Sequence, residues 1–383
     1  MKMIYIANAR IPTEKAHGYQ IMKMCESFAD LGVKVDLILP YRSNKQFRGV
    51  ASFKHYLVKN NFTIKKIYCP DPVFLMNKSG WYIKIQSLFF SLGLLIYLVF
   101  KSRKDEIIYT RDEYFLSWLT WFPNKVIWEA HDLLRSRQTK QWLKCFRIMT
   151  ITQGLKDEMT RLGVPEEKIL VAPDGVDLKL FAGISNSKKD LREELALPLE
   201  EKIILYAGHL YDWKGADTLA QAATFLKNEN VKFVFVGGIG KDLEAFTKSY
   251  GGEKNILIVG QVNRSVVPKY LKAADVLILP NSAKREISSH YSSPLKLFEY
   301  MASGRPIIAS RLDSLQEVLT DEECIFFSPD DAIDLAQKIS HLLSNKELAE
   351  KVAAKAGEKV KDYTWENRAK NIIKFIKYAG SVS

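Results

Sequence analysis

The sequence holds 383 residues, of which 47% are hydrophobic and 26% are charged. At roughly 150 residues per domain this length predicts two domains, and the composition excludes a disordered chain, a collagen-like repeat and a disulfide-stapled miniprotein. The four cysteines lie far apart and form no CxxC pair, which argues against a cysteine zinc site and indicates reduced, cytoplasmic thiols. No secretory signal is expected, because residues 1–8 are typical of a strand.

The formal net charge of +12 is unevenly distributed along the chain. Residues 1–180 hold 28 Lys and Arg against 17 Asp and Glu, so nearly the whole excess lies in the first half. This half either faces an anionic partner, such as a membrane leaflet, a phosphorylated substrate or nucleic acid, or is a basic surface that keeps the protein soluble. No zinc spacing or basic–aromatic recognition motif accompanies the charge, so we expect no nucleic-acid partner.

Short β-rich runs alternate with longer helical patterns from one end of the chain to the other. The strands expected in the first half are 3–7, 33–39, 106–110, 126–129, 148–152 and 169–171. Those expected in the second half are 203–207, 232–236, 256–259, 276–279, 306–309 and 324–327. This alternation predicts the α/β class, with parallel sheets and crossover helices on both faces.

Two such series in one chain predict two doubly wound, Rossmann-like domains that face a central cleft. The stretch 174–191 mixes Gly, Ser, Asn and Lys with weak periodicity and is expected to be a linker. The expected domains are therefore 1–182 and 190–363, and a last helix, 364–383, is expected to pack back on the first domain. In doubly wound folds ligands bind outside the carboxyl ends of the strands, so we expect binding in the cleft.

Residues 85–100 form an uncharged run of 16 residues with lysine or arginine at both ends. A helix of this length spans about 24 Å, which is short of the roughly 30 Å hydrocarbon core of a bilayer. Two interpretations remain: a helix that lies at a membrane surface with its lysines at the headgroups, or a crossover helix buried in the first domain.

A glycine turn follows the expected strand 203–207, and the next helix opens near Lys214 and Gly215. Backbone N–H groups at a helix start, together with a lysine, suit a phosphate. His209, directly after Gly208, could add a second donor. Taken alone, the pattern favours an ordinary turn, because a glycine after a strand is common.

A second helix start is expected at 292–304 (SSPLKLFEYMASG). Ser292 or Ser293 is expected to cap it and Pro294 to be its first residue, which leaves free N–H groups for an anion. Glu299, inside this helix, could accept hydrogen bonds from a ribose diol or could be an ordinary salt-bridged side chain.

The strand 126–129 runs into His131 and Asp132 in the sequence VIWEAHD. A doubly wound domain presents side chains to its ligand at this end of a strand. A histidine here is either a functional residue or a structural one.

Together these segments resemble the retaining GT-B glycosyltransferases of family 4 in the sequence-based classification (glycosyl transferases group 1). The resemblance rests on YAGHLYDWKG (206–215), GQVNRSVVPKYLKAADVLILPNS (260–282), SPLKLFEYMASGRPIIAS (293–310) and IWEAHD (127–132). It covers almost the whole chain, and the motifs of the second domain are specific when they occur together.

The resemblance implies a role for each matching position. Lys214 would contact the donor diphosphate, Glu299 would hold the nucleotide ribose, and His131 would lie against the donor sugar near the reacting carbon. His209 stands where the family has an arginine, which implies a weaker or pH-dependent contact. Further donor-binding positions are His17, Gly18, Gly208, Val262, Tyr291, Ser293, Pro294, Leu295 and Lys296.

The sequence departs from the family at Tyr291, where many members have a first glutamate that touches donor-sugar hydroxyls. The identity of the sugar is therefore open, and Glu286 lies nearby at the wrong spacing to replace that glutamate.

The implied activity is that of a metal-independent hexosyltransferase, without a cofactor. It moves a sugar from a nucleotide diphosphate sugar to a hydroxyl of a glycan or glycolipid, as expected for a lipid-linked or cell-envelope polysaccharide intermediate. The expected place is the cytoplasm, as the cysteines indicate, and the basic first half with residues 85–100 suggests peripheral contact with the anionic inner face of the plasma membrane. The alternatives are a nucleotide-sugar epimerase-like GT-B enzyme and a non-catalytic binder of nucleotide sugar or nucleic acid.

Overall fold

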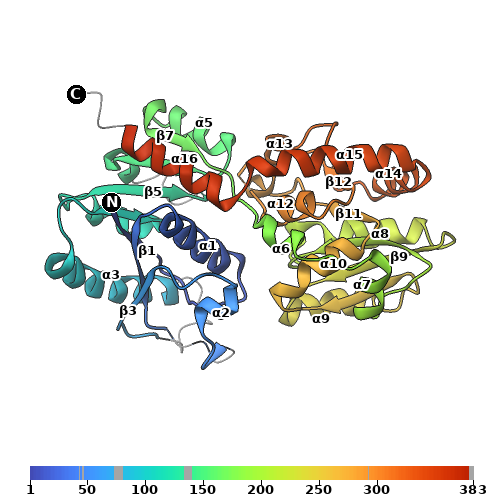
Figure 1. Ribbon diagram of the computed structural model, residues 1–383, viewed down its shortest axis with the longest axis horizontal. Helices are drawn as coiled ribbons and strands as arrows, with labels where there is room; N and C mark the ends of the chain where they lie inside the picture. The colour runs from blue at the N-terminus through green and yellow to red at the C-terminus, as the bar shows by residue number, and fades with distance from the viewer. Residues whose placement is uncertain (43, 45–46, 73–80, 133–139, 292, 379–383) are drawn as a thin grey trace. The chain divides into compact units, whose positions relative to one another are not determined.

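The computed structural model describes residues 1–383 apart from 43, 45–46, 73–80, 133–139, 292 and 379–383. The chain forms two compact units, each a parallel sheet flanked by helices (Figure 1). Unit 1 comprises Met1–Pro173 and the segment that begins at Trp365, and unit 2 comprises Asp174–Thr364. The α/β class and the two doubly wound domains expected from the sequence are confirmed.

Unit 1 is built on a seven-stranded sheet in the order β3-β2-β1-β4-β5-β6-β7. Its strands are β1 Lys2–Ile6, β2 Lys34–Pro40, β3 Thr63–Ile67, β4 Ile107–Thr110, β5 Lys125–Ala130, β6 Arg147–Thr150 and β7 Ile169–Val171. Its α-helices are α1 Ala16–Asp30, α2 Ser52–Tyr56, α3 Trp81–Lys101, α4 Leu116–Leu119, α5 Gln153–Arg161 and α16 Trp365–Tyr378. Its 3₁₀ turns are η3 Glu113–Phe115, η5 Gln141–Lys144 and η6 Glu166–Lys168. The strand order reverses between β1 and β4, which makes their carboxyl ends the expected ligand position of this sheet.

Unit 2 is built on a six-stranded sheet in the order β10-β9-β8-β11-β12-β13. Its strands are β8 Lys202–Ala207, β9 Val231–Val236, β10 Ile256–Gly260, β11 Val276–Leu279, β12 Ile307–Ser310 and β13 Ile325–Phe327. Its α-helices are α6 Leu178–Ala182, α7 Lys188–Glu194, α8 Ala216–Phe225, α9 Gly240–Tyr250, α10 Val267–Ala273, α11 Glu286–Ser289, α12 Leu295–Ala302, α13 Asp313–Gln316, α14 Ala332–Ser344 and α15 Lys346–Lys359. Its 3₁₀ turns are η7 Asp212–Lys214, η8 Arg264–Val266 and η9 Val360–Asp362. The strand order reverses between β8 and β11.

The sheet of unit 2 is buried on both faces, as a parallel sheet must be. Alternate residues of β8 point to opposite faces, so Leu205 lies in one hydrophobic core and Tyr206 in the other. Burial of both faces requires strands that are hydrophobic at nearly every position. The twelve strands expected from the sequence are present, and their ends differ from the expected ones by at most two residues.

β3 is the strand that the sequence analysis missed. It lies at the edge of the sheet, pairs only with β2, and carries Lys65 and Lys66 in its middle. An edge strand exposed in this way lacks the apolar run that marks the other strands.

The structure divides the chain at Pro173, earlier than the expected 182–190. The stretch expected to be a linker contains α6 and α7, both in unit 2. Asp177 caps α6, and Ser187 and Asp190 form a reciprocal capping box on α7. These short capped helices begin at polar residues that composition alone marks as a loop.

The chain returns to unit 1 at its C-terminal end (Figure 1). α16 packs against α1, with Trp365 edge-on to the ring of Tyr19. The helix expected from residue 364 therefore starts one residue later in the structure and belongs to the first unit.

Candidate functional site

The turn after β8 is shaped by two glycines. Gly208 has φ 152° and donates its N–H to the Val236 carbonyl oxygen over 2.8 Å. Gly215 has φ 71°, and a Cβ atom there would lie 1.6 Å from the carbonyl oxygen of Pro280, which follows β11. Only glycine fits this approach, and it places Lys214 and the start of α8 at the reversal of strand order.

Replacing Gly215 by alanine is expected to lower the stability of unit 2 by about 3 kcal/mol or more, because the new methyl group meets backbone in a left-handed conformation. The matched control is Gly357, inside α15, where no atom lies within 4 Å of the place that a Cβ atom would take. There alanine should raise stability by about 0.5–1 kcal/mol. Thermal unfolding of both variants checks the pair, and equal melting temperatures would contradict the close approach.

Two lysines of unit 2 hold their ammonium groups above aromatic rings. The Nζ of Lys214 lies 3.7 Å from the ring centre of Trp213, and the Nζ of Lys296 lies 4.4 Å from that of Tyr206. The Lys296 Nζ is closed to solvent and has no hydrogen-bond partner in the described part of the chain. No carboxylate among the described residues forms an ion pair with either lysine.

The environment of these lysines disfavours their charge. Burial lowers the pKa of Lys214 from 10.5 to about 7. Burial also lowers the pKa of Lys296 well below its ordinary value, and the nearby charge of Lys214 lowers it further. Two ammonium groups that repel each other without a carboxylate between them form a site that an anion would stabilise.

The N-terminus of α12 lies beside Lys296, which is its second residue. Pro294 occupies the N-cap position, and no side chain caps the helix. The expected cap is therefore wrong for Ser293, whose Oγ instead accepts a hydrogen bond from the Asp174 N–H over 3.2 Å. Ser292 lies outside the described residues. Because no side chain caps them, the first amides of α12, those of Leu295 and Lys296, are available to an anion.

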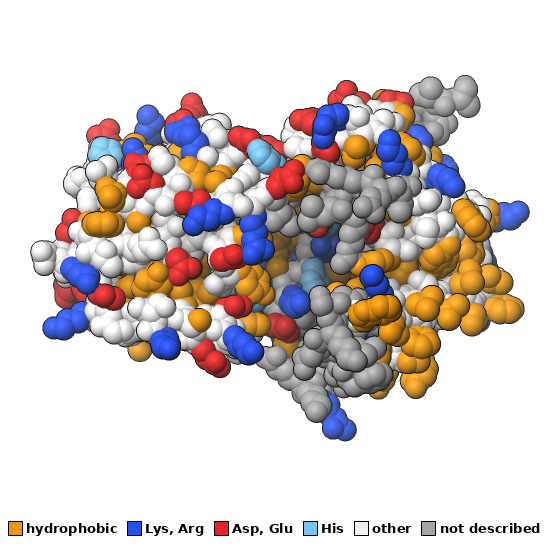
Figure 2. Space-filling model, turned by 180° about the vertical axis from the view of Figure 1, so that it is seen from behind, with side chains coloured by type: hydrophobic (Ala, Val, Ile, Leu, Met, Phe, Trp, Pro, Cys, Tyr) orange, Lys and Arg blue, Asp and Glu red, His pale blue; other side chains and the backbone are white. Residues whose placement is uncertain are grey.

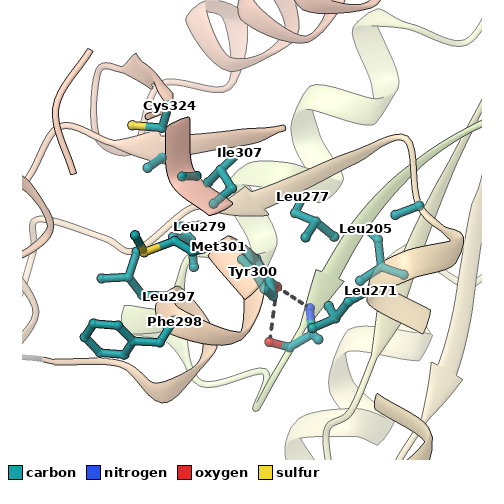
Figure 3. Close-up of a cluster of buried hydrophobic side chains, with 14 of the residues drawn as sticks. Leu205, Leu271, Leu277, Leu279, Leu297, Phe298, Tyr300, Met301, Ile307 and Cys324 are labelled. Carbon is teal, nitrogen blue, oxygen red and sulfur yellow. Dashed lines mark hydrogen bonds between the residues drawn. The ribbon is translucent and has the colours of Figure 1, made fainter. Parts of the chain in front are cut away.

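Tyr300 joins α12 to the end of β8. Its hydroxyl accepts a hydrogen bond from the Ala207 N–H over 2.7 Å and donates one to the Ala207 carbonyl oxygen over 3.4 Å (Figure 3). The ring is fully buried among Leu271, Leu277 and their neighbours in the core of unit 2. This contact fixes the turn at Gly208 relative to the helix that carries Lys296.

Glu299 is not free in the structure. Its carboxylate accepts a hydrogen bond from Arg264 of η8, a residue that the sequence analysis did not select. Arg264 follows Val262, which packs against the core of the same unit. A ribose that binds Glu299 would therefore meet a carboxylate already oriented by an arginine.

The remaining expected donor-binding residues of unit 2 lie around this centre. The His209 ring stacks on Tyr211 with ring centres 4.9 Å apart, and the His209 carbonyl oxygen accepts a hydrogen bond from the Tyr206 hydroxyl over 2.5 Å. Tyr291 is buried and donates a hydrogen bond to Glu286 over 3.0 Å. Glu286, which sequence spacing argued against, is thus joined to the position where the family often has a glutamate.

In unit 1 a fully buried carboxylate, Glu129 at the end of β5, lies behind His131. The His131 Nε2 is 2.6 Å from Glu129 Oε1, and the same oxygen accepts a hydrogen bond from Gln20 Nε2 over 2.6 Å. The Tyr109 hydroxyl donates to the other oxygen, and Arg368 of α16 lies 3.2 Å from it. Glu129 therefore orients the ring of His131 through its contact with Nε2.

The charge on Glu129 is maintained by its neighbours. Burial would raise the pKa of this carboxyl, but the positive charge of Arg368, the hydrogen bond with His131 and the charge of Arg111 hold it well below its ordinary value. Arg368 is also anchored, because its Nε donates to the carbonyl oxygens of Ala172 and Pro173. Sequence reasoning quoted both segments but missed this pair, which joins residues 239 positions apart.

His17 and Gly18 lie in the first turns of α1. Burial, followed by the charges of Arg111 and Lys15, lowers the pKa of His17 to about 3, so its ring is neutral at pH 7. A Cβ at Gly18 would lie 2.4 Å from the hydroxyl of Tyr56, which itself bonds to the Thr13 backbone. Packing against Tyr56 therefore requires a glycine here, whatever ligand the loop binds.

Within the described residues no cluster of three or more His, Cys, Asp and Glu side chains is arranged to hold a metal ion. Metal independence stays a prediction. The expected residues of each unit gather at the carboxyl ends of strands in their own sheet, and binding of one donor by both units also stays a prediction.

Two doubly wound parallel sheets, one of them with paired lysines and an uncapped helix start at its strand reversal, define the GT-B class of glycosyltransferase folds. Residues 187–359, most of unit 2, match the family model of glycosyl transferases group 1. Unit 2 is therefore similar to the glycosyl transferases of group 1, and the whole chain has the GT-B fold.

Several curated proteins are similar to about half of the chain. D-inositol 3-phosphate glycosyltransferase of Xylanimonas cellulosilytica is 28% identical over 58% of this chain and 54% of its own length. The putative teichuronic acid biosynthesis glycosyltransferase TuaC of Bacillus subtilis is 27% identical over 50% of this chain and 46% of its own length. Phosphatidyl-myo-inositol mannosyltransferase of Mycobacterium leprae is 30% identical over 45% and 46%. The chain thus matches about half the length of these relatives.

Solved structures agree with the fold over the whole chain. Sucrose-phosphate synthase of Thermosynechococcus elongatus is 20% identical with a TM-score of 0.78, and the comparison covers 100% of both chains. Anabaena Alr3699/HepE in complex with UDP is 14% identical with a TM-score of 0.75, covering 99% of this chain and 100% of the other. At these identities the likeness shows the GT-B fold.

Proposed function

We propose that the chain is a retaining hexosyltransferase that uses a nucleotide diphosphate sugar as donor and a hydroxyl as acceptor. The observation that carries this proposal is the pair of Lys214 and Lys296, whose ammonium groups have no counter-ion among the described residues. Buried cations of this kind are costly unless an anion completes them. A diphosphate beside the free amides of α12 would do so.

The supporting comparisons point to the same ligand class. The group 1 model covers the part of the chain that holds both lysines. A similar structure, Anabaena Alr3699/HepE, is described in complexes with UDP and with UDP-glucose. We infer that the donor diphosphate of this chain contacts Lys214, Lys296 and the N-terminus of α12, and that Glu299 accepts hydrogen bonds from the ribose.

In the proposed reaction the bond from the sugar's anomeric carbon to the diphosphate oxygen breaks, and a bond from the same carbon to the acceptor oxygen forms. The acceptor's proton passes to the leaving phosphate on the same face of the sugar, which retains the anomeric configuration. Negative charge grows on the diphosphate as it leaves, so the lysines and helix amides stabilise the transition state most. His131, held by Glu129, is proposed to lie against the donor sugar.

The proposed acceptor is a lipid-linked or cell-envelope polysaccharide intermediate, and the proposed place of action is the cytoplasm. Names of similar proteins support this class: one is a putative teichuronic acid glycosyltransferase, and another is a phosphatidyl-myo-inositol mannosyltransferase. The sugar and the nucleotide base are left open.

A panel of UDP, GDP, ADP and dTDP sugars tests the proposal. One donor is expected to raise the melting temperature of the protein, because a ligand that binds only the folded state stabilises it by about 2.7 kcal/mol at 100 times its Kd. The shift should persist in excess EDTA, since lysines and amides replace a metal at the diphosphate. Loss of the shift in EDTA would contradict metal independence, and no shift with any donor would contradict the donor site itself.

A further inference from the structure

α3 of unit 1 presents an apolar face to the solvent. Side chains at eight positions of this helix are exposed by 40% to 77%: Trp81, Ile83, Leu88, Leu92, Leu95, Ile96, Val99 and Phe100. Apart from Ile83 and Phe100, near the two ends, these positions recur at helical spacing and form one stripe along the 21-residue helix. At 1.5 Å per residue the helix is about 31 Å long. Hydrophobic side chains gather at the lower right of Figure 2, over unit 1.

The opposite face of α3 holds the helix in the unit partly through polar contacts. Tyr82, Gln86 and Ser87 are buried there together with three apolar residues. Ser87 accepts a hydrogen bond from Asn8 over 3.0 Å. The Tyr82 hydroxyl donates to Asp71 over 2.5 Å and accepts from Arg10 over 2.7 Å. The inner face is therefore half polar, while the outer face carries a continuous apolar stripe that water does not favour.

This polar anchorage decides how α3 could meet a bilayer. By length and composition alone the helix could cross a membrane. Crossing would break the contacts of Tyr82 and Ser87 and would bring Gln86 into hydrocarbon. The helix can keep these contacts only if it lies flat, with the apolar stripe in the lipid and the unit above it.

The charges within residues 81–104 are all of one sign, and the first acidic residue after the helix is Asp105. Residues 81–104 contain four basic side chains, Lys84, Lys101, Arg103 and Lys104, and no Asp or Glu. All four are exposed, and the Lys84 ammonium is 5.7 Å from the ring centre of Trp81. Lysines and a tryptophan beside an apolar stripe suit the headgroup layer of an anionic membrane.

We infer that the outer face of α3 docks on an anionic lipid bilayer, with its axis along the surface. A second copy of the chain fits this face less well. Two α3 helices packed face to face would bring Lys84 against Lys101 or its own copy, with no acidic residue in either segment to neutralise them. The inference goes beyond the proposed activity, because membrane docking requires no donor or acceptor.

Vesicle sedimentation of the full chain tests this inference. The protein is expected to sediment with vesicles of phosphatidylcholine and phosphatidylglycerol, and much less with phosphatidylcholine alone. The triple variant Lys101→Gln, Arg103→Gln, Lys104→Gln should bind the anionic vesicles about a hundredfold more weakly, since each basic residue near the surface contributes about fivefold. The double variant Leu92→Glu, Val99→Glu should bind at least tenfold more weakly.

The matched control places two glutamates on exposed apolar positions of unit 2, Leu199→Glu and Ile333→Glu, and should bind as the unaltered protein does. Equal binding by the Leu92→Glu, Val99→Glu variant would overturn the inference. A dimer that light scattering detects and that only this variant dissociates would also overturn the inference, because the face would then bind a second copy of the chain. Turnover of a donor with a water-soluble acceptor needs no vesicle, so failure of docking leaves the proposed function standing.

Discussion

Replacing Lys214 by methionine is expected to lower kcat/KM for sugar transfer by about 10² to 10³, which is the usual cost of one donor that stabilises charge in a transition state. Methionine keeps an apolar stem beside Trp213 and removes only the ammonium group. The matched control is Lys248→Met, at an exposed lysine of α9 in the same unit, for which no change is expected. Initial rates over a range of donor concentrations separate kcat from KM, and full activity of the Lys214 variant would contradict its proposed role.

Lys296→Met should separate a functional role from a structural one. The Lys296 ammonium is buried without a partner among the described residues, so the apolar replacement is expected to raise the melting temperature of the free protein. The same change should weaken donor binding at least tenfold. A residue with a merely structural role would move stability and affinity in the same direction.

The affinity for a nucleoside diphosphate should fall as the pH rises above 7. The pKa of Lys214 is about 7 in the free protein, so at pH 8.5 its side chain is largely the neutral amine. A bound diphosphate favours the charged lysine, and binding must then take up a proton. The phosphate itself is already ionised above its second pKa near 6, so the change reports on the protein. We expect a loss of up to tenfold per pH unit, reduced in Lys214→Met; calorimetry in buffers of different ionisation enthalpy measures the uptake.

The fold was predictable because parallel strands must be hydrophobic at nearly every position. Twelve strands follow from that pattern, and β3 does not, because two of its five residues are lysines and it lies at the sheet edge. The position of Lys214 was predictable for a similar reason: a glycine turn after a strand and a helix start are local signals. Glycine at position 215 fits these local signals. The structural reason for it is not local, because the Pro280 oxygen that excludes a Cβ there is 65 residues away in the sequence.

The site residues that were missed depend on contacts between distant segments. Nothing near Arg264 in the sequence shows that it pairs with Glu299, and the cap expected at Ser293 fails because its hydroxyl bonds to Asp174. The sequence left two interpretations of α3 open, a membrane-surface helix and a buried crossover helix, since composition shows how apolar a helix is and not which side its unit covers.

The second large effect is expected at Glu129, where glutamine should lower the stability of unit 1 by about 3 to 5 kcal/mol. The change leaves the nearly buried guanidinium of Arg368 without the carboxylate that neutralises it. The matched control is Asp30→Asn, which breaks the exposed ion pair with Lys59 in the same unit and should cost at most about 1 kcal/mol. Urea unfolding followed by circular dichroism measures both, and equal costs would contradict the importance of the buried charge.

The stability difference between the unaltered protein and Glu129→Gln should depend on pH, and the direction of the Glu129 pKa shift says how. The pKa of Glu129 is lowered in the folded protein, so its contribution is fully present above the unfolded pKa of about 4.3 and is lost as the pH falls through the folded value. The gap between the unaltered protein and Glu129→Gln should therefore be constant from pH 6 to 8 and shrink below about pH 4. Donor affinity, which we assign mainly to unit 2, should change little, while kcat falls because His131 loses the carboxylate that orients its ring. An unchanged kcat in a folded variant would show that Glu129 serves the fold alone.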